Sequence, residues 1–500
     1  MARFAVACGH ERTAETAENV LNEGGTAADA AVAAAMMAMV AEPILAGLLG
    51  GGFAMVVDEG ETKLLDFFVQ TPKNRTDDID FRSVYADFGA TRQEFHVGAG
   101  SIATPGAAPG LVELHARAGR IPFRELVKPA IEAARAGIAI NAYQARLGQI
   151  IAPILTASDA ARQLMCDDAG PLPEAATYTN PAFADVLEVF AIEGTRFVTE
   201  GEVAAALVAL GRDGGHLSDV DLRRYQPIWR APHVSRRGGV TLALNPPPSL
   251  GGILIDLSLA LSETRATALS LARAFDAVDR ARKESGDDVA ALLAPDLVER
   301  YRKNLAEHPV SSRGTTHISV VDAQGMAVAL TLSNGEGCGL IAPGTGIMPN
   351  NMLGEEDLVP GGWHSWAKDT RLASMMCPLA MHWPDGRLAM LGSGGSNRIR
   401  TALAQVILHM IDRAWPIDAA IDAARLHVEA GILDVELPGL ADADRTVLAA
   451  AYPEAAFWEV PSMFFGGVHG VMRDRKGACW AAADARRAGV ALPAAHSVAV

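Results

Sequence analysis

The N-terminal part of the chain has the hydrophobic pattern of a buried helix followed by a strand hairpin. Residues 27–40 (AADAAVAAAMMAMV) are rich in the helix formers Ala and Met and apolar on nearly every face, which predicts a buried helix. A glycine pair precedes this segment and Pro43 follows it, so the helix is bounded at both ends. Residues 53–58 and 62–68 flank a turn at 59–61 and predict the hairpin.

The middle of the chain has the composition of a helical region. Residues 110–280 are predicted to be mostly helical, with one helix over 219–225 and another that starts at Ile253. The segment 246–252 (PPPSLGG) is predicted to be a rigid loop, because its three prolines fix φ and remove backbone donors. Charged and small residues dominate 284–314, which predicts a mobile connector.

After residue 315 the pattern changes to short strands joined by tight turns. Pairs of predicted strands flank these turns, and a helical stretch lies between the last two pairs. Hairpins in both halves of the chain, with helices between them, indicate an α+β fold in which helices cover sheets. The predicted strand pairs are 316–321 with 326–333, 379–383 with 387–391, and 468–473 with 478–483, and the helical stretch is 401–414.

Composition and charge exclude several classes of function. The chain has 500 residues, of which 50% are hydrophobic and 20% charged, and its net charge of −16 disfavours nucleic acid as a partner. The five Cys and thirteen His show no paired metal-ligand spacing, so neither a metal site nor a disulfide framework is expected. The apolar stretch 4–9 is shorter than a signal peptide needs, and Glu42, Pro43 and a glycine run interrupt the apolar segment 30–57. We therefore expect a cytoplasmic protein with no membrane partner.

One segment combines a candidate nucleophile with a candidate cleavage site. Residues 311–334 read SSRGTTHISVVDAQGMAVALTLSN, with Gly314 and Thr315 before a predicted strand. An N-terminal threonine carries a hydroxyl nucleophile and its own amine as general base, and attack of the Thr315 hydroxyl on the Gly314 carbonyl would release that amine. Glycine at position 314 leaves this carbonyl sterically open. The same residues also fit the ordinary start of a strand, since threonine favours β structure.

A glycine-rich segment follows the predicted strand 387–391. Residues 392–396 read GSGGS, and their backbone N–H groups are free to face a cavity, where each such donor stabilises an acyl-transfer oxyanion by roughly 3–4 kcal/mol. A phosphate-binding loop is a rival interpretation, but the segment lacks the lysine of a P-loop. A tight turn between a strand and a helix is the third interpretation.

Taken together and in order, these segments resemble the γ-glutamyltransferase family of N-terminal-nucleophile hydrolases. The resemblance covers nearly the whole chain, and each motif stands in the family's order. The motifs are GGTAADAAVAAA, EP and GGGF within 22–58, SIATPGAAPG at 101–110, PPPSLGG at 246–252, TTHISVVD at 315–322, GTGIMPNN at 344–351, LASMMCP at 372–378 and GSGGSNRI at 392–399.

The resemblance implies a four-layer αββα sandwich, the N-terminal-nucleophile hydrolase fold, built jointly by a large segment 1–314 and a small segment 315–500. It implies self-cleavage between Gly314 and Thr315, after which Thr315 is the nucleophile and the two fragments stay packed around one shared core. The implied reaction is transfer or hydrolysis of a γ-glutamyl group on a small-molecule amide through a Thr315 ester, with no metal or organic cofactor.

The same resemblance assigns further site residues. Thr316 or Ser333 hydrogen-bonds the nucleophile, and Gly394 and Gly395 form the oxyanion hole. The implied substrate-binding residues are Asn334 and Glu355 near the substrate's α-amino group, Ser374 at its α-carboxylate, and Arg75 as the nearest candidate for the arginine that pairs with that carboxylate.

Several positions depart from the family's usual residues. The serine pair that holds the carboxylate reads Ala373-Ser374, Glu355 stands where the family has Asp, and Met352 stands where it has Gln. Arg75 does not stand at the family's spacing, which bears on γ-glutamyl specificity because bidentate Arg–carboxylate recognition is strong. The alternatives are therefore an acylase or amidase for a substrate without a γ-glutamyl group, such as a β-lactam side chain, or an unprocessed, inactive relative.

Overall fold

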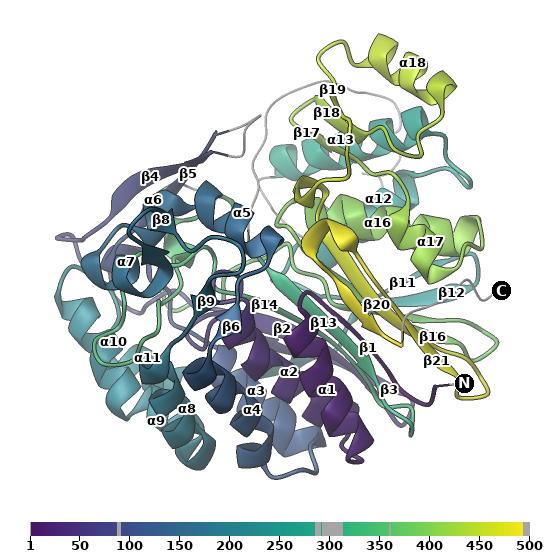
Figure 1. The fold of residues 1–500 in the computed structure, drawn as a ribbon. Coiled ribbons are helices and arrows are strands. Elements are labelled where there is room, and N and C mark those ends of the chain that lie inside the picture. The colour runs from purple at the N-terminus through teal and green to yellow at the C-terminus, as the bar shows by residue number, and fades with distance from the viewer. Residues whose placement is uncertain (1, 88–91, 286–291, 293–313, 360–361, 494–500) are drawn as a thin grey trace.

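Two antiparallel sheets face each other at the centre of the protein, and helices cover the outer face of each sheet (Figure 1). The computed structural model describes the chain except for residues 1, 88–91, 286–291, 293–313, 360–361 and 494–500. The first helices of the chain cover one sheet, and helices from the middle and the C-terminal part cover the other. The protein is thus a mixed structure of helices and sheets, as the predicted hairpins and helices indicated.

The larger sheet combines strands from both sides of residue 315. Its seven strands pair antiparallel in the order β10-β3-β2-β14-β13-β1-β22, so β13 and β14 lie between β2 and β1 from the part before residue 315, and β22 pairs with β1 at the edge. Helices α1 to α4 pack on this side of the molecule. The bounds are β1 (Ala5–Cys8), β2 (Gly51–Asp58), β3 (Glu61–Phe67), β10 (Ile228–Arg230), β13 (Thr316–Val321), β14 (Ala327–Ser333), β22 (Val490–Leu492), α1 (Glu11–Asn22), α2 (Ala27–Ala41), α3 (Ala107–Ala118) and α4 (Phe123–Ala136).

The second sheet packs directly on the first. Its six strands pair antiparallel in the order β11-β12-β15-β16-β20-β21, and β16 and β20 contact β13 across the interface. Helices α12, α16 and α17 pack against this sheet. The bounds are β11 (His233–Arg237), β12 (Val240–Leu244), β15 (Leu379–His382), β16 (Leu388–Gly394), β20 (Gly467–Arg473), β21 (Cys479–Ala483), α12 (Gly251–Leu261), α13 (Ala268–Ser285), α16 (Arg398–Asp412) and α17 (Ile417–Asp422).

Helix α2 is the buried helix that the sequence predicts. Its start is fixed by a capping box, in which Thr26 Oγ1 accepts from Asp29 N at 3.1 Å and Asp29 Oδ2 accepts from Thr26 N at 2.9 Å. All 15 of its residues are buried, which explains why it is apolar all round. It ends at Ala41, and Glu42 leaves the helical conformation because the residue before Pro43 is disfavoured in the helical region. None of the helices within the described residues has the length and apolarity needed to cross a membrane.

Two sets of strands were not predicted from the sequence. Residues 110–280 contain, besides their helices, the strands β10, β11 and β12. β10 and β11 are short and carry charged side chains, whereas β12 (VTLAL) is a short, mostly apolar run without alternation. The N-terminal apolar stretch is the buried strand β1, which pairs with β13 and β22. The connector predicted over 284–314 lies almost wholly outside the described residues, and helix α13 extends to Ser285.

Candidate active site

Thr315 lies directly before β13, with its side chain against the peptide bond that joins it to Gly314. Its hydroxyl donates to the carbonyl oxygen of Gly314 at 2.6 Å, and the residue is 5% exposed. The Ser333 hydroxyl, at the end of β14, donates to the same oxygen at 3.1 Å. The register of the sheet explains this approach. Thr316 pairs with Leu332 in antiparallel strands, so Thr315, one residue earlier, lies opposite Ser333, one residue later. Two hydroxyl groups thus polarise the carbonyl that self-cleavage would attack.

The nitrogen of Gly314 is held as firmly as its carbonyl. Gly314 N donates to Glu336 Oε1 at 2.7 Å, and Glu336 is 3% exposed. The loop that carries this carboxylate is fixed at two points, since Gly335 N donates to Ser333 Oγ at 3.0 Å and Glu336 N donates to Asn351 Oδ1 at 3.0 Å. Sequence reasoning did not single out Glu336, which lies in the loop directly after the β13–β14 hairpin.

Gly394 lies against the backbone of Thr315, and Gly395 follows it against Gly466 and Arg487. A Cβ atom built on Gly394 would lie 2.1 Å from the carbonyl oxygen of Thr315, so only glycine permits this approach. Gly395 has a φ of 120°, a conformation that side chains with a Cβ rarely adopt. These residues form the turn between β16 and α16. Their role as an oxyanion hole stays a prediction, which the contact with Thr315 supports.

Two buried charged residues that the sequence did not single out lie behind Thr315. Arg487 Nη1 donates to the carbonyl oxygen of Thr315 at 3.4 Å, and Glu42 Oε1 accepts from Thr316 Oγ1 at 3.1 Å. Burial raises the pKa of Glu42 to about 7, although the Thr316 hydroxyl and the Arg487 guanidinium act to lower it. Of the two hydroxyls expected near the nucleophile, Ser333 therefore bonds Gly314 whereas Thr316 bonds Glu42.

A pocket with an empty volume of about 370 Å³ lies in front of Thr315. Glu355 and Ser374, two of the predicted substrate-binding residues, line it together with Ser333. Among the described residues that form its wall, none carries a positive charge. The apolar part of the wall consists of Phe68, Met352, Leu358, Met375, Met376 and Ile399.

The proline-rich loop predicted at 246–252 holds one wall of this pocket. Ser249 Oγ and Leu250 N both donate to the carbonyl oxygen of Ser374, at 2.8 and 2.9 Å. Gly251 allows a further close approach, because a Cβ there would lie 2.2 Å from the carbonyl oxygen of Met375. The loop therefore positions Ser374 and the neighbouring methionine.

Asn334 and Arg75 do not line this pocket. Asn334 Nδ2 donates to the carbonyl oxygen of Met348 at 3.0 Å. Arg75 donates to the carbonyl oxygen of Trp366, and its guanidinium lies 4.6 Å from the centroid of that indole ring. Their predicted roles in substrate binding stay predictions. The structure brings together Gly314, Thr315, Ser333, Gly394, Gly395, Glu355 and Ser374.

Comparisons with known sequences agree on one family. A family model described as gamma-glutamyltranspeptidase matches residues 13–494. The chain is similar to the Acylase ACY 1 proenzyme of Pseudomonas sp. (strain V22), with 29% identity over 472 residues that cover 87% of this chain and 84% of that proenzyme. It is similar to the same degree to the Glutathione hydrolase proenzyme of Pseudomonas aeruginosa, with 29% identity over 473 residues that cover 85% of this chain and 82% of the relative.

Comparisons with solved structures give two kinds of neighbour. The crystal structure of cephalosporin acylase from Bacillus halodurans matches with a TM-score of 0.82 and 21% identity, over 98% of this chain and 95% of that one. At this identity the likeness concerns the fold. A gamma-glutamyltranspeptidase from Pseudomonas nitroreducens matches with a TM-score of 0.51 and 27% identity, over 60% of this chain and 94% of that one.

Proposed function

The chain belongs to the gamma-glutamyltranspeptidase family, and we propose that it cleaves itself between Gly314 and Thr315 and then acts on amide bonds through the freed Thr315. It is an enzyme related to glutathione hydrolases and acylases. One observation carries the proposal: the hydroxyls of Thr315 and Ser333 both donate to the carbonyl oxygen of Gly314, whose N–H is held by Glu336. We further infer that the facing sheets and their covering helices form the αββα sandwich of this enzyme class.

Self-cleavage proceeds by transfer of the Gly314 acyl group from nitrogen to oxygen. The Thr315 hydroxyl oxygen bonds to the Gly314 carbonyl carbon, the bond from that carbon to the Thr315 nitrogen breaks, and the hydroxyl proton ends on this nitrogen. The Ser333 hydroxyl stabilises the charge that develops on the Gly314 oxygen. Water then hydrolyses the ester, which leaves a carboxylate on Gly314 and restores the Thr315 hydroxyl beside a free amine.

The same hydroxyl then acts on a substrate amide. The freed amine of Thr315 takes the hydroxyl proton, the oxygen bonds to the substrate carbonyl carbon, and the proton passes to the leaving amine as the amide bond breaks. Backbone donors of Gly394, which lies against Thr315, and of the next residue Gly395 would hold the oxyanion. Water or an acceptor amine resolves the ester. Residues 1–314 and 315–500 would remain together, because their strands interleave within the larger sheet.

The pocket in front of Thr315 favours an acyl group without an essential carboxylate. A γ-glutamyl donor such as glutathione needs a cation for its α-carboxylate, and none lines the described wall of this pocket. Arg75 would have to leave Trp366 to supply that charge. Among the described residues the wall is largely apolar and has one carboxylate, Glu355, so it is better matched to an acyl group that is apolar or carries an amine. The acylase alternative is therefore our preferred substrate assignment.

Acylation of Thr315 tests the proposed function. The enzyme is incubated with p-nitroanilides of γ-glutamyl, glutaryl and neutral acyl groups, quenched in acid, digested and analysed by mass spectrometry. We expect an acyl group on the peptide that begins with Thr315, and faster release of nitroaniline from a neutral acyl group than from γ-glutamyl. A γ-glutamyl preference would restore glutathione-like donors. Absence of any acylated Thr315 would instead identify an inactive relative.

A further inference from the structure

In the uncleaved chain, Gly314 occupies the position that the acyl group of a substrate would take at Thr315. In the ester formed during self-cleavage, the Gly314 acyl group is attached to Thr315 Oγ1, the same atom that carries the acyl group of a substrate. Its carbonyl carbon, its Cα and its nitrogen therefore stand in for the first atoms of a substrate acyl group. The groups that contact Gly314 therefore show which groups would contact a substrate acyl group. This inference rests on the function proposed above.

The carboxylate of Glu336 lies where an α-amino group would bind. It accepts from Gly314 N at 2.7 Å, and that nitrogen is attached to the carbon next to the carbonyl. An α-aminoacyl group carries its ammonium at this same position. The ammonium would replace a neutral N–H donor with a charged one, which makes a shorter and stronger hydrogen bond to a carboxylate. The bonds from Glu336 N to Asn351 and from Gly335 N to Ser333 hold this carboxylate in place.

The space beside Gly314 Cα leads toward apolar side chains. A Cβ atom built on Gly314 would lie 3.4 Å from Leu45 Cδ2, in ordinary contact, and 3.2 Å from the carbonyl oxygen of Gly335, which must yield by a few tenths of an ångström. Leu45 lines an apolar pocket with an empty volume of about 390 Å³. An L-amino acid side chain on the acyl group would therefore point from Gly314 toward Leu45.

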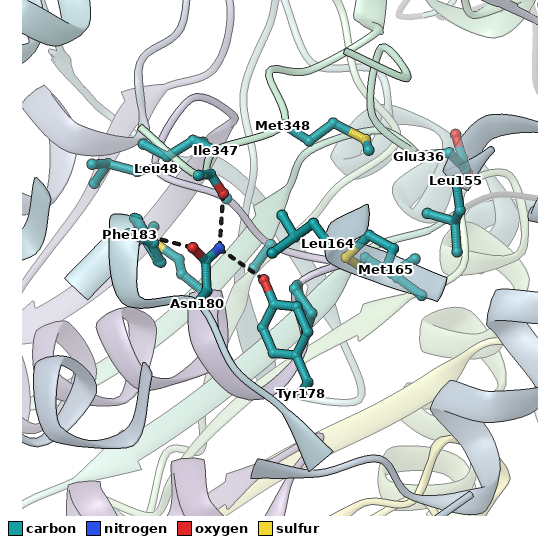
Figure 2. Close-up of a pocket in the computed structure, with 16 residues that line it drawn as sticks. Leu48, Leu155, Leu164, Met165, Tyr178, Asn180, Phe183, Glu336, Ile347 and Met348 are labelled. Atoms are coloured by element: carbon teal, nitrogen blue, oxygen red, sulfur yellow. Dashed lines mark hydrogen bonds between the residues drawn. The ribbon is translucent and has the colours of Figure 1, made fainter. Parts of the chain in front are cut away.

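A second apolar pocket adjoins the first and contains Glu336 itself. Its empty volume is about 460 Å³, and it shares Pro43, Ile44, Leu155 and Met165 with the pocket at Leu45. Figure 2 shows Glu336 beside Leu155 at one end of this pocket, with Leu164, Met165 and Met348 along its wall. At the other end the Asn180 side chain bonds the Tyr178 hydroxyl and the Gly346 carbonyl, so this end is closed by satisfied polar groups. The carboxylate thus lies at the edge of an apolar region.

We infer that Glu336 and the apolar region behind Leu45 form a subsite for an α-aminoacyl group with a hydrophobic side chain, such as leucyl or methionyl. The substrate class is then an amide or peptide with a free N-terminal amine. A γ-glutamyl group does not fit this arrangement, because its ammonium is separated from the reacting carbonyl by the whole side chain. The inference also gives Glu336 and Glu355 different tasks, since Glu355 lines the pocket in front of Thr315.

The rates at which the wild-type enzyme hydrolyses matched anilides test this subsite. We compare kcat/KM for L-leucyl, glycyl and γ-glutamyl p-nitroanilide with that for 4-methylpentanoyl p-nitroanilide, which is the leucyl compound without its amine. The leucyl compound should exceed its deaminated analogue by about tenfold to a hundredfold, because a hydrogen bond to a charged group is lost with the amine. It should also exceed the glycyl compound, because the apolar region receives its side chain.

The possible outcomes distinguish failure of the subsite from failure of the proposed function. Equal rates for leucyl and 4-methylpentanoyl p-nitroanilide, with Thr315 acylated by both, overturn the subsite and leave the proposed function intact. Failure of every anilide to acylate Thr315 overturns the proposed function, and the subsite with it.

Two matched substitutions test whether Glu336 causes the preference for an acyl group with an α-amine. Glu336→Gln should lower the ratio of leucyl to 4-methylpentanoyl kcat/KM by about tenfold, because the charged acceptor becomes neutral, whereas Asp434→Asn, which changes a buried carboxyl bonded to Trp458, should keep that ratio. Since Glu336 also holds Gly314, the cleaved fraction of each variant is measured first and rates are normalised to it. An unchanged ratio in Glu336→Gln overturns the assignment of this residue. If that variant stays uncleaved, the wild-type comparison decides alone.

Discussion

The two sides of Thr315 are built from different kinds of parts. On the backbone side, Gly314, Ser333 and Gly394 reach Thr315 through main-chain and hydroxyl contacts that the strand register and the absence of a Cβ dictate. On the pocket side, the wall is made of side chains such as Phe68 and Met352, which come from loops far apart in the chain. The groups that meet the Gly314 carbonyl thus come from the main chain and from short hydroxyl side chains, whereas most of the surface in front of Thr315 consists of side chains from distant segments. Similar proteins include both an acylase and a glutathione hydrolase.

Removal of the nucleophile should have the largest effect. Thr315→Ala lacks the hydroxyl that both self-cleavage and turnover require, so we expect an intact chain and a loss of activity of at least about a thousandfold. Denaturing electrophoresis and anilide hydrolysis measure the two effects. Thr315→Ser keeps a hydroxyl and serves as the matched control, which should retain part of both. A cleaved Thr315→Ala chain would show that another residue is the nucleophile.

A side chain at Gly394 should lower kcat by disturbing the contact with the Thr315 main chain, while the pocket wall stays unchanged. In Gly394→Ala the new methyl group would overlap the carbonyl oxygen of Thr315, so the glycine segment must shift and kcat should fall by about a hundredfold. Gly60→Ala, in the exposed turn between β2 and β3, is the control, because no atom lies within 4 Å of a Cβ there. Steady-state kinetics on cleaved enzyme measure the loss. A kcat equal to that of wild type would remove these glycines from the oxyanion site.

The buried carboxyl of Glu42 should make stability depend on pH. Below pH 4.5 it is protonated in both the folded and the unfolded state and contributes nothing. Between pH 4.5 and about 7 the unfolded state ionises first, so the free energy of unfolding falls as pH rises, and the loss is complete above pH 7. The full loss of unfolding free energy is about 3 kcal/mol, because burial raises the pKa of this group to about 7.

Replacement of that carboxyl should remove the pH dependence. Glu42→Gln keeps an acceptor for Thr316 but does not titrate, so its stability relative to wild type should be greater at pH 8 than at pH 5. Urea unfolding of both proteins at these two pH values measures the difference. An equal difference at both pH values would contradict the burial of an ionisable group behind the nucleophile.

The hydroxyl of Ser333 should have the smallest of these effects. It is one of two donors to the Gly314 carbonyl, so Ser333→Ala should slow self-cleavage by about tenfold. Ser333→Thr keeps the hydroxyl and should cleave close to the wild-type rate. The half-life of freshly purified precursor measures both. Equal half-lives for the alanine and threonine variants would leave Thr315 as the sole relevant donor.

Much of the fold was predictable because its central elements have strong local patterns. The all-apolar segment that became α2 and the hairpins β2–β3 and β13–β14 follow from periodicity and turn residues, and their bounds differ from the prediction by only a few residues. The strands β10 and β11 were missed because their sequences, such as HVSRR, are short and polar, and β12 was missed because a five-residue apolar run does not distinguish a strand from a helix. Such strands form because a neighbouring strand pairs with them, and no local pattern records that partner.

The candidate site was predictable on its backbone side and much less so elsewhere. Thr315 and Gly394 belong to compact motifs, and the structure places them in contact. Glu336, Glu42 and Arg487 were missed because each owes its position to packing between distant segments. The only local signal was the Glu-Pro pair after the buried helix, which marked a helix end and did not indicate that its carboxylate would reach Thr316.

Sequencing of the N-termini in purified wild-type enzyme tests the central claim most directly. We expect a second N-terminus that reads Thr-Thr-His, beginning at Thr315, in amounts equal to the first, and its absence in Thr315→Ala. A fully active preparation that shows a single N-terminus and an uncut chain would contradict the account, because the general base on which it depends would never have been released.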